Sequence, residues 1–522
     1  MAQTGQGNIL EPSWEEYVLP SQEPIGKTAY TRPLLGSELV FDQLHNLVDG
    51  FVEVCMGITI STAFSGEELL ARAKEAVIRW RYVLRILSAQ PSVALIHSSF
   101  VCPIMAATPR FGIHHPKLRS WIYTPLANHD EAYSWAEETV VMLDEVIDPS
   151  SFIQRINITR LPYILSDGTA QHLRVYVFRP SSLVNVFAIF FHGPHAMLDA
   201  KPNMQAFSTL LEFMSSPQDI ALADLPWGTE HKNLPTGPVT VTGGRSKEWE
   251  TVGNALFAKA AGMHANLSAA HHLMRRPNTD VGTGKVQRAL IELTEAETAS
   301  VVQALKHAGF GFGHLVEAAT ALALYDLKPV PEDQSESAHV TFMAGMISLH
   351  GRMSPPYRDS KTHLVSSLAM VPISISLAGL ADLTPKERLL SALAQSKAHY
   401  DEYLANPCIL QFTAEHMRIA PLLDVDAFGR PACGIVTNLG RVENYLPNIW
   451  PRIVEDCGAG GPPVFRVDKL HFGHRLIPEI PNVHVWSMNS RFSIQIQAAD
   501  VWEEATPQAY LNKIVQQMLL IV

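Results

Sequence analysis

The sequence has 522 residues, a formal net charge of −11 and a pI of about 6.0. A hydrophobic content of 47% and a charged content of 17% exclude an intrinsically disordered chain and predict a globular protein of two or three domains. The acidic balance disfavours a general nucleic-acid or anionic-membrane binder, because no surplus of basic residues exists to neutralise phosphates.

The ends of the chain and its cysteines predict a cytoplasmic protein. The opening residues, MAQTGQGNILEPSWEEY, lack the basic and apolar regions of a secretory signal, and the closing QQMLLIV matches no lipidation or retention signal. Five cysteines, at positions 55, 102, 408, 433 and 457, are scattered without a CxxC pair. This spacing indicates reduced thiols rather than a disulfide framework or a zinc site.

The first part of the chain predicts alternating helices and strands. Residues 66–87 carry apolar side chains at helical spacing, and residues 131–147 and 203–216 predict two further helices. Strands are expected at 92–100, 173–180 and 184–191, the last two separated by a Pro-Ser-Ser turn. We therefore interpret residues 1–222 as one α/β half.

The remainder of the chain predicts a crossover followed by a second α/β half. Residues 223–285 are rich in Pro, Gly and Thr at both ends, which indicates a linker, with one helix expected within 251–274. The second half spans 286–522. Its strands are predicted at 287–293, 339–349, 366–377, 432–440, 481–490 and 491–500. Its helices are predicted at 294–307 after a Thr-x-x-Glu capping box, at 314–327, at 384–406 and from 507 onward.

Some conspicuous patterns do not indicate a function. The glycines of GFGFG (309–313) lie between two predicted helices, so they predict a helix–helix loop rather than a phosphate site after a strand. No GxSxG elbow and no HExxH pair occurs, which disfavours a serine hydrolase and a zinc enzyme. The longest run without Asp, Glu, Lys, Arg or His, residues 364–381, contains a proline and four serines and predicts buried strands rather than a membrane span.

The stretch FFHGPHAMLDA (190–200) carries the main candidates for chemistry. His195 and Asp199 follow a predicted buried strand and precede a predicted helix. A histidine at a strand end can be held rigidly with one ring nitrogen free for proton transfer. An aspartate four residues later can fix the loop through its backbone or through an arginine. Taken locally, this spacing fits equally well a strand-ending turn whose histidine is satisfied by ordinary hydrogen bonds.

A strand, H-x-x-x-D and a helix in the middle of a two-half α/β chain resemble the chloramphenicol-acetyltransferase-like superfamily. That superfamily includes plant-type HxxxD acyltransferases and the condensation domains of nonribosomal peptide synthetases. The nearest resemblance is to fungal secondary-metabolite O-acyltransferases of the trichothecene 15-O-acetyltransferase type. Further stretches carry the resemblance along the chain: TRPLLGSELVFDQL (31–44), WRYVLR (80–85), VTFMAGMISLHGRMSPP (340–356), GIVTNLGRVENYLP (434–447) and SMNSRFSIQIQAAD (487–500).

The sequence departs from the superfamily's patterns at specific positions. The condensation motif HHxxxDG would have its first His where this chain has Pro194 and its final Gly where this chain has Ala200. Pro194 removes a backbone donor, and Ala200 adds bulk. The plant-type signature DFGWG corresponds at best to HFGHR (471–475), which lacks the aspartate.

The resemblance implies a fold of two chloramphenicol-acetyltransferase-like subdomains, each a mixed sheet with flanking helices, arranged as a pseudo-dimer around a tunnel. An acyl thioester would enter one mouth of the tunnel and an acceptor the other. His195 would be the general base, and Asp199 would brace its loop through an arginine. Arg85 is the first candidate for that arginine and Arg32 the second, and for each the alternative is an ordinary solvated side chain.

The second half is expected to contribute to the same tunnel. By the resemblance, Thr437, Asn438 and Gly440 would line it, and a hydroxyl or amide there could bind the developing oxyanion. The alternative is an ordinary turn, because Asn and Gly are common turn residues.

The function implied by the resemblance is transfer of an acyl group, expected to be acetyl, from a CoA thioester to a hydroxyl of a small hydrophobic secondary metabolite. Acyl-CoA would be a co-substrate, with no bound cofactor or metal. The protein is expected to be a monomer with no nucleic-acid partner and no membrane insertion. Two alternatives stay open: a cyclisation or condensation without acyl-CoA, and a non-catalytic binding protein of the same fold.

Overall fold

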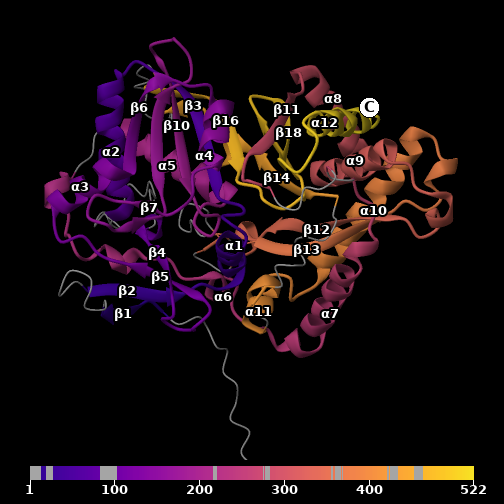
Figure 1. The fold of residues 1–522 in the computed structure, drawn as a ribbon, viewed down its shortest axis with the longest axis horizontal. Helices are drawn as coiled ribbons and strands as arrows, with labels where there is room; N and C mark the ends of the chain where they lie inside the picture. The colour runs from indigo at the N-terminus through magenta and orange to yellow at the C-terminus, as the bar shows by residue number, and fades with distance from the viewer. Residues whose placement is uncertain are drawn as a thin grey trace, which may run out of the picture.

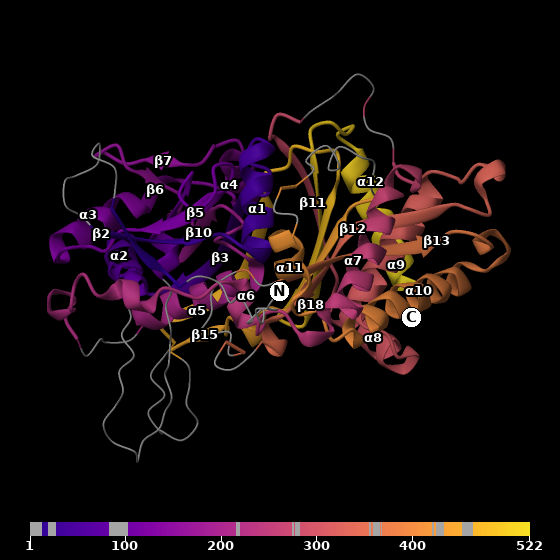
Figure 2. The same ribbon diagram turned by 90° about the horizontal axis from the view of Figure 1, so that it is seen from below.

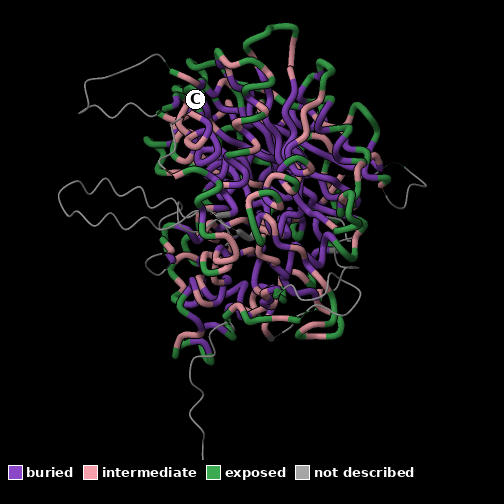
Figure 3. The backbone as a smooth tube through the Cα atoms, turned by 90° about the vertical axis from the view of Figure 1, so that its left-hand side faces the viewer, coloured by how far each residue is buried: buried purple, intermediate pink, exposed green. Residues whose placement is uncertain are grey.

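The computed structural model describes residues 13–18, 28–82, 103–215, 220–273, 276, 282–353, 357–358, 366, 368–419, 422–423, 433–451 and 463–522. The chain forms two α/β halves that lie side by side, one built mainly from the first part of the sequence and the other from the last part (Figure 1). Buried residues run through the interior of the molecule and exposed ones lie mainly at its periphery (Figure 3), and one large apolar cluster occupies each half.

The first half is built on a six-stranded sheet with the strand order β15-β16-β3-β10-β9-β6. Its strands are β3 (Val54–Thr62), β6 (Val140–Val146), β9 (Arg174–Arg179), β10 (Val186–Gly193), β15 (Ile449–Trp450) and β16 (Phe465–His474). β10 lies between β3 and β9 and pairs antiparallel with both. Because both its edges are paired and both its faces are covered, β10 requires the nearly continuous apolar run seen in the sequence.

Successive residues of β10 face two different layers of helices, as strand geometry requires. Phe191 stacks on Phe207 of α5 (Ala200–Ser215), with ring centroids 3.8 Å apart. Phe190 packs on Phe152 of α4 (Pro149–Asn157), with centroids 4.9 Å apart. The α5 layer also includes α2 (Gly66–Tyr82) and α3 (His129–Thr139).

Smaller elements complete this half. A four-stranded sheet has the order β1-β2-β5-β4 and consists of β1 (Glu15–Val18), β2 (Thr28–Pro33), β4 (Thr108–Phe111) and β5 (Arg119–Tyr123). A short hairpin pairs β7 (Tyr163–Ile164) with β8 (Ala170–Gln171). Helix α1 (Gly36–Leu47) follows β2 and lies against α11 (Phe412–Ile419) at the boundary between the halves (Figure 2).

The second half contains a four-stranded sheet and a two-stranded one. The four-stranded sheet has the order β11-β18-β17-β14 and consists of β11 (Val286–Glu292), β14 (Ile435–Arg441), β17 (Asn482–Met488) and β18 (Arg491–Ala499). β12 (His339–Ser348) pairs with β13 (Leu368–Ser376). The helices of this half are α8 (Glu295–Ala308), α9 (Phe312–Leu327), α10 (Pro385–Ala405) and α12 (Thr506–Leu519).

The two halves exchange chain rather than merely touching. β15 and β16 come from the last part of the sequence, between β14 and β17, yet β16 pairs antiparallel with β3 of the first sheet. The predicted boundary at residue 286 therefore does not separate the two main sheets. The crossover 223–285 contains the expected helix as α7 (Val252–Ala265), preceded by the short α6 (Pro238–Val241).

Most elements predicted from periodicity are present. They include the two strands that precede the turn at His195, β9 and β10, and all four helices predicted in the second half. The glycine run 309–313 is confirmed as the junction between two helices, because α8 ends at Ala308 with Gly309 as its C-cap at φ +74°, and α9 begins at Phe312. The capping box is confirmed by reciprocal bonds between Thr294 and Glu297.

Other predictions were wrong or incomplete. The helix predicted over 131–147 ends at Thr139, and residues 140–146 form β6, because this valine-rich segment pairs with β9. Helices α1, α4 and α11 and strands β3 and β16 were not predicted from the sequence. The strand predicted at 92–100 and the end of the helix predicted at 66–87 lie outside the described residues.

Two further observations concern membrane-spanning helices and disulfides, neither of which the sequence predicts. Among the described residues, no helix is long and apolar enough to cross a membrane, and the charge-free run 364–381 contains the buried strand β13. The three cysteines in the described part of the chain, Cys55, Cys408 and Cys433, are buried free thiols.

Candidate active site

The candidate motif forms a tight turn between β10 and α5. The backbone N–H groups of Met197 and Leu198 both donate to the carbonyl of Pro194, each at 2.9 Å. Pro194 thus contributes an acceptor to the turn, so its missing N–H does not prevent the turn from forming. The side chain of His195 is held at the start of this turn and is 9% exposed.

Two nearly parallel rings orient His195. Phe41 of α1 stacks on it with ring centroids 3.7 Å apart and an interplanar angle of 12°. His474, at the end of β16, lies parallel to it within 8° at a centroid distance of 5.4 Å. Packing between rings from two other elements therefore fixes the plane of the imidazole.

The surroundings of His195 favour the neutral imidazole. Burial lowers the pKa of His195 below its ordinary value, and this outweighs the opposing effects of Asp199 and of the residue's own backbone carbonyl. Nδ1 is enclosed and has no other partner among the described residues, which leaves Nε2 as the nitrogen that can meet a ligand. A neutral ring held in this way can accept a proton.

A cavity of about 470 Å³ opens beside His195, between the two halves. Residues of α1 form its wall on the side of the first half, and residues of α7, α11, β12, β14 and β17 form its other walls. None of the described residues that line it is Asp, Glu, Lys or Arg. The cavity is therefore suited to a neutral, largely apolar molecule.

A second pocket of about 50 Å³ reaches His195 from another side. Asp199, Ala200 and Lys201 line this pocket but not the larger one. His195, Met346, Thr437 and His474 line both. His195 thus lies on the wall shared by two pockets, which is the position expected of a base between two substrates.

Asp199 braces the turn without the predicted arginine among its described partners. Its Oδ1 accepts a bond from the N–H of Ala200 at 2.7 Å, and its Oδ2 accepts one from the hydroxyl of Ser366 at 3.3 Å. Arg32, the second candidate, instead donates to both carboxylate oxygens of Glu38 at 2.8 and 2.9 Å, so that expectation is corrected. Arg85, the first candidate, lies outside the described residues.

The candidates on β14 separate into two groups. Thr437 lines both pockets and Asn438 lines the smaller one. Gly440 lines neither; it has φ +80°, and its N–H donates to Oδ1 of Asn438 at 2.9 Å. The Asn-x-Gly segment therefore forms a local turn in the strand, and only Thr437 is placed beside His195 and the larger cavity together.

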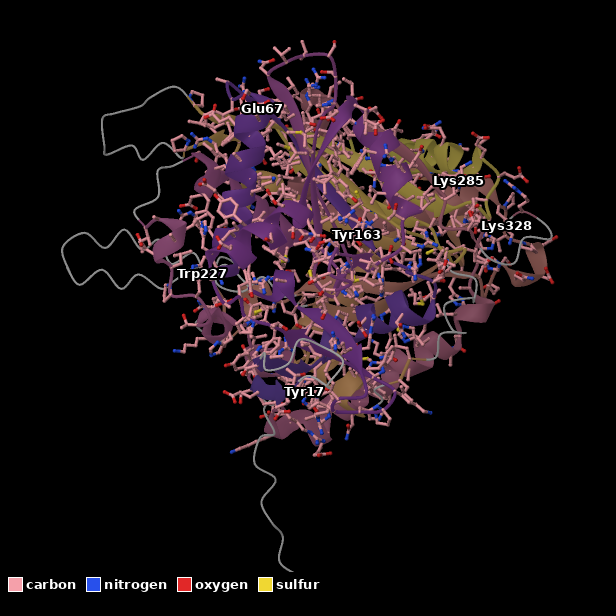
Figure 4. The ribbon with its side chains drawn as sticks, turned by 60° about the vertical axis from the view of Figure 1, so that its left-hand side comes forward. Tyr17, Glu67, Tyr163, Trp227, Lys285 and Lys328 are labelled. Atoms are coloured by element: carbon pink, nitrogen blue, oxygen red, sulfur yellow. The ribbon has the colours of Figure 1, made fainter. Side chains whose placement is uncertain are left out.

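His192, the other histidine of the motif, belongs to a different network. It is fully buried, its Nδ1 bonds the hydroxyl of Tyr163 (labelled in Figure 4), and its Nε2 lies 3.9 Å from Oε2 of Glu53. Burial lowers the pKa of His192 to about 4. It lines neither pocket, which agrees with its interpretation as a neighbour of the reactive residue.

Three aromatic side chains around His195 were not predicted from the sequence. Phe41 stacks on it, His474 lies parallel to it, and His484 of β17 lies beside His474 with ring centroids 5.0 Å apart. In the segment HFGHR (471–475), which lacks the aspartate of the plant-type signature, the second histidine is the residue that reaches the site. No group of metal-ligating side chains occurs in the described parts of the chain.

Comparisons with known proteins agree with this geometry. Residues 182–417, somewhat less than half of the chain, match the family model of the 15-O-acetyltransferase Tri3, and this segment includes His195 and Asp199. A search of curated protein sequences finds no match.

Similar solved structures cover nearly the whole chain. The TRI3 trichothecene 15-O-acetyltransferase from Fusarium sporotrichioides superposes with a TM-score of 0.75 at 16% identity, covering 98% of each chain. The first condensation domain of the CDA synthetase gives a TM-score of 0.57 at 12% identity, covering 93% of this chain and 96% of that one. Polyketide synthase associated protein 5 from Mycobacterium tuberculosis gives 0.54 at 13% identity, covering 93% and 97%.

These identities are low, so the superpositions establish the fold, and the family match supplies the class of enzyme. By the two together, the predicted resemblance to the chloramphenicol-acetyltransferase-like superfamily, the fold of paired subdomains and the assignment as an acyltransferase are confirmed.

Proposed function

We propose that the protein transfers an acyl group, expected to be acetyl, from a CoA thioester to a hydroxyl of a neutral, largely apolar secondary metabolite. The observation that carries the proposal is the position of His195 on the wall shared by two pockets. The match to a 15-O-acetyltransferase family over the segment that holds His195 supports both the acetyl group and the hydroxyl acceptor.

In this proposal His195 acts as general base. Its Nε2 takes the proton of the acceptor hydroxyl as the oxygen attacks the thioester carbonyl, which forms a new C–O bond and a tetrahedral oxyanion. Collapse of the oxyanion breaks the C–S bond, and the imidazolium returns the proton to the departing thiolate. No covalent intermediate with the enzyme is needed. Thr437 is the hydroxyl placed to donate to the oxyanion.

The charges of the side chains that line the two pockets support assigning one pocket to each substrate. The larger cavity has no cationic side chain among its described lining residues, so it offers nothing to the phosphates of CoA. The smaller pocket is lined by Lys201. We therefore assign the larger cavity to the acceptor and the side of the smaller pocket to the thioester, which is a co-substrate and not a resident cofactor. One chain supplies both sides, so a monomer suffices.

The test is an acyl-transfer assay with the purified protein. Acetyl-CoA is mixed with a panel of neutral apolar alcohols, free thiol is followed with a thiol reagent, and the ester is identified by mass spectrometry. His195→Ala should lower kcat/KM by about 100-fold or more while leaving the melting temperature close to that of the parent. The matched control is His307→Ala, which removes an exposed histidine in the last turn of α8.

The outcomes separate the alternatives. Near-parental transfer by His195→Ala would rule out the general-base role. Absence of thiol release with every acceptor would favour the reaction without acyl-CoA or the non-catalytic binding protein over the transferase.

A further inference from the structure

Two histidines line the part of the acceptor cavity that α7 and α11 form. His264 of α7 and His416 of α11 are half-buried. Protein atoms enclose the nitrogens of His474, which lies beside His195, but they do not enclose Nδ1 of His264 or either nitrogen of His416. These three nitrogens are therefore accessible to a ligand that fills the cavity.

The ring of His416 is held by packing rather than by hydrogen bonds. Helices α7 and α11 lie side by side (Figure 1). Phe257 of α7 meets the ring edge-on, with centroids 4.7 Å apart and an interplanar angle of 89°. Phe412, one turn earlier on α11, lies 6.0 Å from it. His416 makes no hydrogen bond to a described residue, so both of its nitrogens can bond a ligand.

The hydrogen bond of His264 determines which of its nitrogens carries the proton. Nε2 bonds the carbonyl oxygen of Met343 at 3.0 Å. A carbonyl oxygen only accepts, so Nε2 must donate, and in the neutral ring Nδ1 then has no proton. Nδ1 of His264 is therefore an acceptor, and it requires a donor from the ligand.

His416 supplies the complementary half of the site. Burial, and to a lesser extent His264, lower the pKa of His416 below its ordinary value, so its ring is neutral and presents one donor and one acceptor. The effect of His264 also indicates that the two rings are close to one another. A ligand hydroxyl is able to donate to His264 and to accept from His416. A ligand carbonyl only accepts, so it would leave Nδ1 of His264 unpaired.

β12 separates this pair of histidines from His195. Met343 holds His264, and Met346 lines both pockets together with His195; the two methionines are three residues apart on β12. Three residues of a strand span about 10 Å, and less where the pairing is irregular, as it is between 342 and 345. This spacing is comparable to the length of a fused ring system. Most other lining side chains are aliphatic, aromatic or Met, which suits a hydrocarbon scaffold.

We infer that His264 and His416 bind a second hydroxyl of the acceptor, at the end of its ring system opposite the hydroxyl that is acylated, so that the protein selects fused-ring diols over mono-alcohols. The inference rests on the proposed function in placing the acylated hydroxyl at His195. An acceptor without the second hydroxyl would displace water from both histidines without replacing its hydrogen bonds, which lowers affinity.

The experiment measures binding without a donor, so it does not depend on acyl transfer. 2-Decalol and decalin-2,6-diol of the same ring fusion are titrated into the full-length protein by calorimetry. The parent should bind the diol about tenfold more tightly, because two hydrogen bonds are gained at the second hydroxyl. His264→Phe and His416→Phe each remove one partner and should each lower this ratio to about threefold or less.

A ketone tests the direction of the hydrogen bond to His264. 6-Hydroxy-2-decalone is able to accept from His416 but has no proton to donate to Nδ1 of His264, so the parent should bind it less tightly than the diol. In His264→Phe the diol and the ketone should bind with similar affinity, because the acceptor that distinguishes them is gone.

His272→Phe is the matched control. His272 is half-buried in the same crossover, its Nδ1 bonds a backbone carbonyl, that of Ala270, at 2.8 Å, and it does not line the cavity. This variant should retain the full preference for the diol, and melting temperatures of all variants show whether each remains folded.

Failure of the diol to bind the parent, equal affinity of the parent for diol and mono-alcohol, or an unchanged ratio in both His264→Phe and His416→Phe would overturn the inference. Thiol release from acetyl-CoA is measured separately on the same proteins. Preference for the diol without acyl transfer would overturn the proposed function but leave the diol site standing, whereas transfer without the preference would do the reverse.

Discussion

His195 is kept neutral by burial rather than by a neighbouring cation. Phe41 and His474 cover its ring, and loss of water around the ring disfavours the charged form. The carboxylate of Asp199 opposes this shift only in part, because the loss of water around the ring is the larger effect. As the proposed base, the residue therefore needs no deprotonation step before each turnover at neutral pH.

This protonation state predicts the pH dependence of the reaction. The folded-state pKa of His195 lies below 6.5, so the active neutral form persists as the pH falls through 7 and is lost only below 6.5. The acidic limb of kcat/KM should therefore have its midpoint under pH 6.5, measured with a buffer series at constant ionic strength. A midpoint at or above pH 7 would contradict the assignment of the base.

Asp199 is proposed to position His195, so its loss is expected to affect both stability and turnover. Asp199→Ala removes the acceptors of Ala200 N–H and of the Ser366 hydroxyl, which should cost about 1–2 kcal/mol of unfolding free energy and lower kcat more than it changes KM. Asp199→Asn keeps one acceptor oxygen and should lose less of both. Denaturant titration and steady-state kinetics measure the two effects.

The control for Asp199 is Asp224→Ala, an exposed aspartate at the start of the crossover. If Asp199→Ala is as stable as the parent, the bracing role is wrong. A fall in stability with unchanged kcat would show that the residue supports the fold without orienting His195.

At the scale of elements, β3 supports the motif strand, although periodicity did not predict it. β3 pairs with β10 on one side and with β16 on the other, so it joins the strand that precedes His195 to the strand that ends at His474. Its residues are buried on both faces, and a strand in that environment has no alternation of apolar and polar residues to detect.

Gly57 of β3 lies where Phe190 of β10 needs space. A Cβ at position 57 would lie 2.4 Å from the ring of Phe190, which is itself held by Phe152 and Phe178. Gly57→Ala should therefore cost about 1–3 kcal/mol of unfolding free energy, measured by denaturant titration. Gly262→Ala is the control: Gly262 lies in α7 with nothing within 4 Å of an added Cβ, and this change should be neutral or stabilise by up to about 1 kcal/mol. Equal effects of the two changes would contradict the packing argument.

At the scale of the whole molecule, the site exists because the halves share a sheet. β16 belongs to the second part of the chain but completes the first sheet, and Arg475 directly after it donates to the carbonyls of Asp49 and Asn157, each at 2.7 Å. These contacts hold His474 at the end of β16 beside His195. The same interlocking couples the stability of one half to that of the other.

Because its carboxyl group is buried, Glu317 is expected to make the stability of the whole molecule depend on pH. It is buried in α9, where Ser396 and Tyr400 of α10 donate to its carboxyl group, and burial raises its pKa to about 7. In the unfolded chain the group ionises near 4.5, so the folded state loses stability as the pH rises from about 4.5 to 7. The loss amounts to about 3 kcal/mol.

Glu317→Gln imitates the protonated acid and removes this dependence. Between pH 5 and pH 8 the variant should lose less unfolding free energy than the parent, by up to about 3 kcal/mol, in denaturant titrations at both pH values. Glu332→Gln, an exposed carboxylate in the same half, is the control and should follow the parent. Parallel pH profiles for Glu317→Gln and the parent would contradict the raised pKa.

Local sequence determined the elements whose pattern is independent of distant contacts. Amphipathic helices, the capping box at Thr294, the glycine loop at 309–313 and the apolar strand before His195 all follow from short-range periodicity and backbone preference. The family resemblance pointed to His195, which lines both pockets, and to Asp199, which lines the smaller one.

The tertiary structure alone decided which groups surround His195. The side chains that reach the site come from elements far apart in the sequence. They are Phe41 of α1, His474 of β16, His484 of β17 and Ser366 in a loop before β13. Their positions depend on sheet order and on the insertion of β16 beside β3, and pairing between distant strands leaves no local periodic signal. The sequence alone therefore predicted the candidate base, whereas the neutral protonation state of His195 follows from burial, which only the packing of the two halves creates.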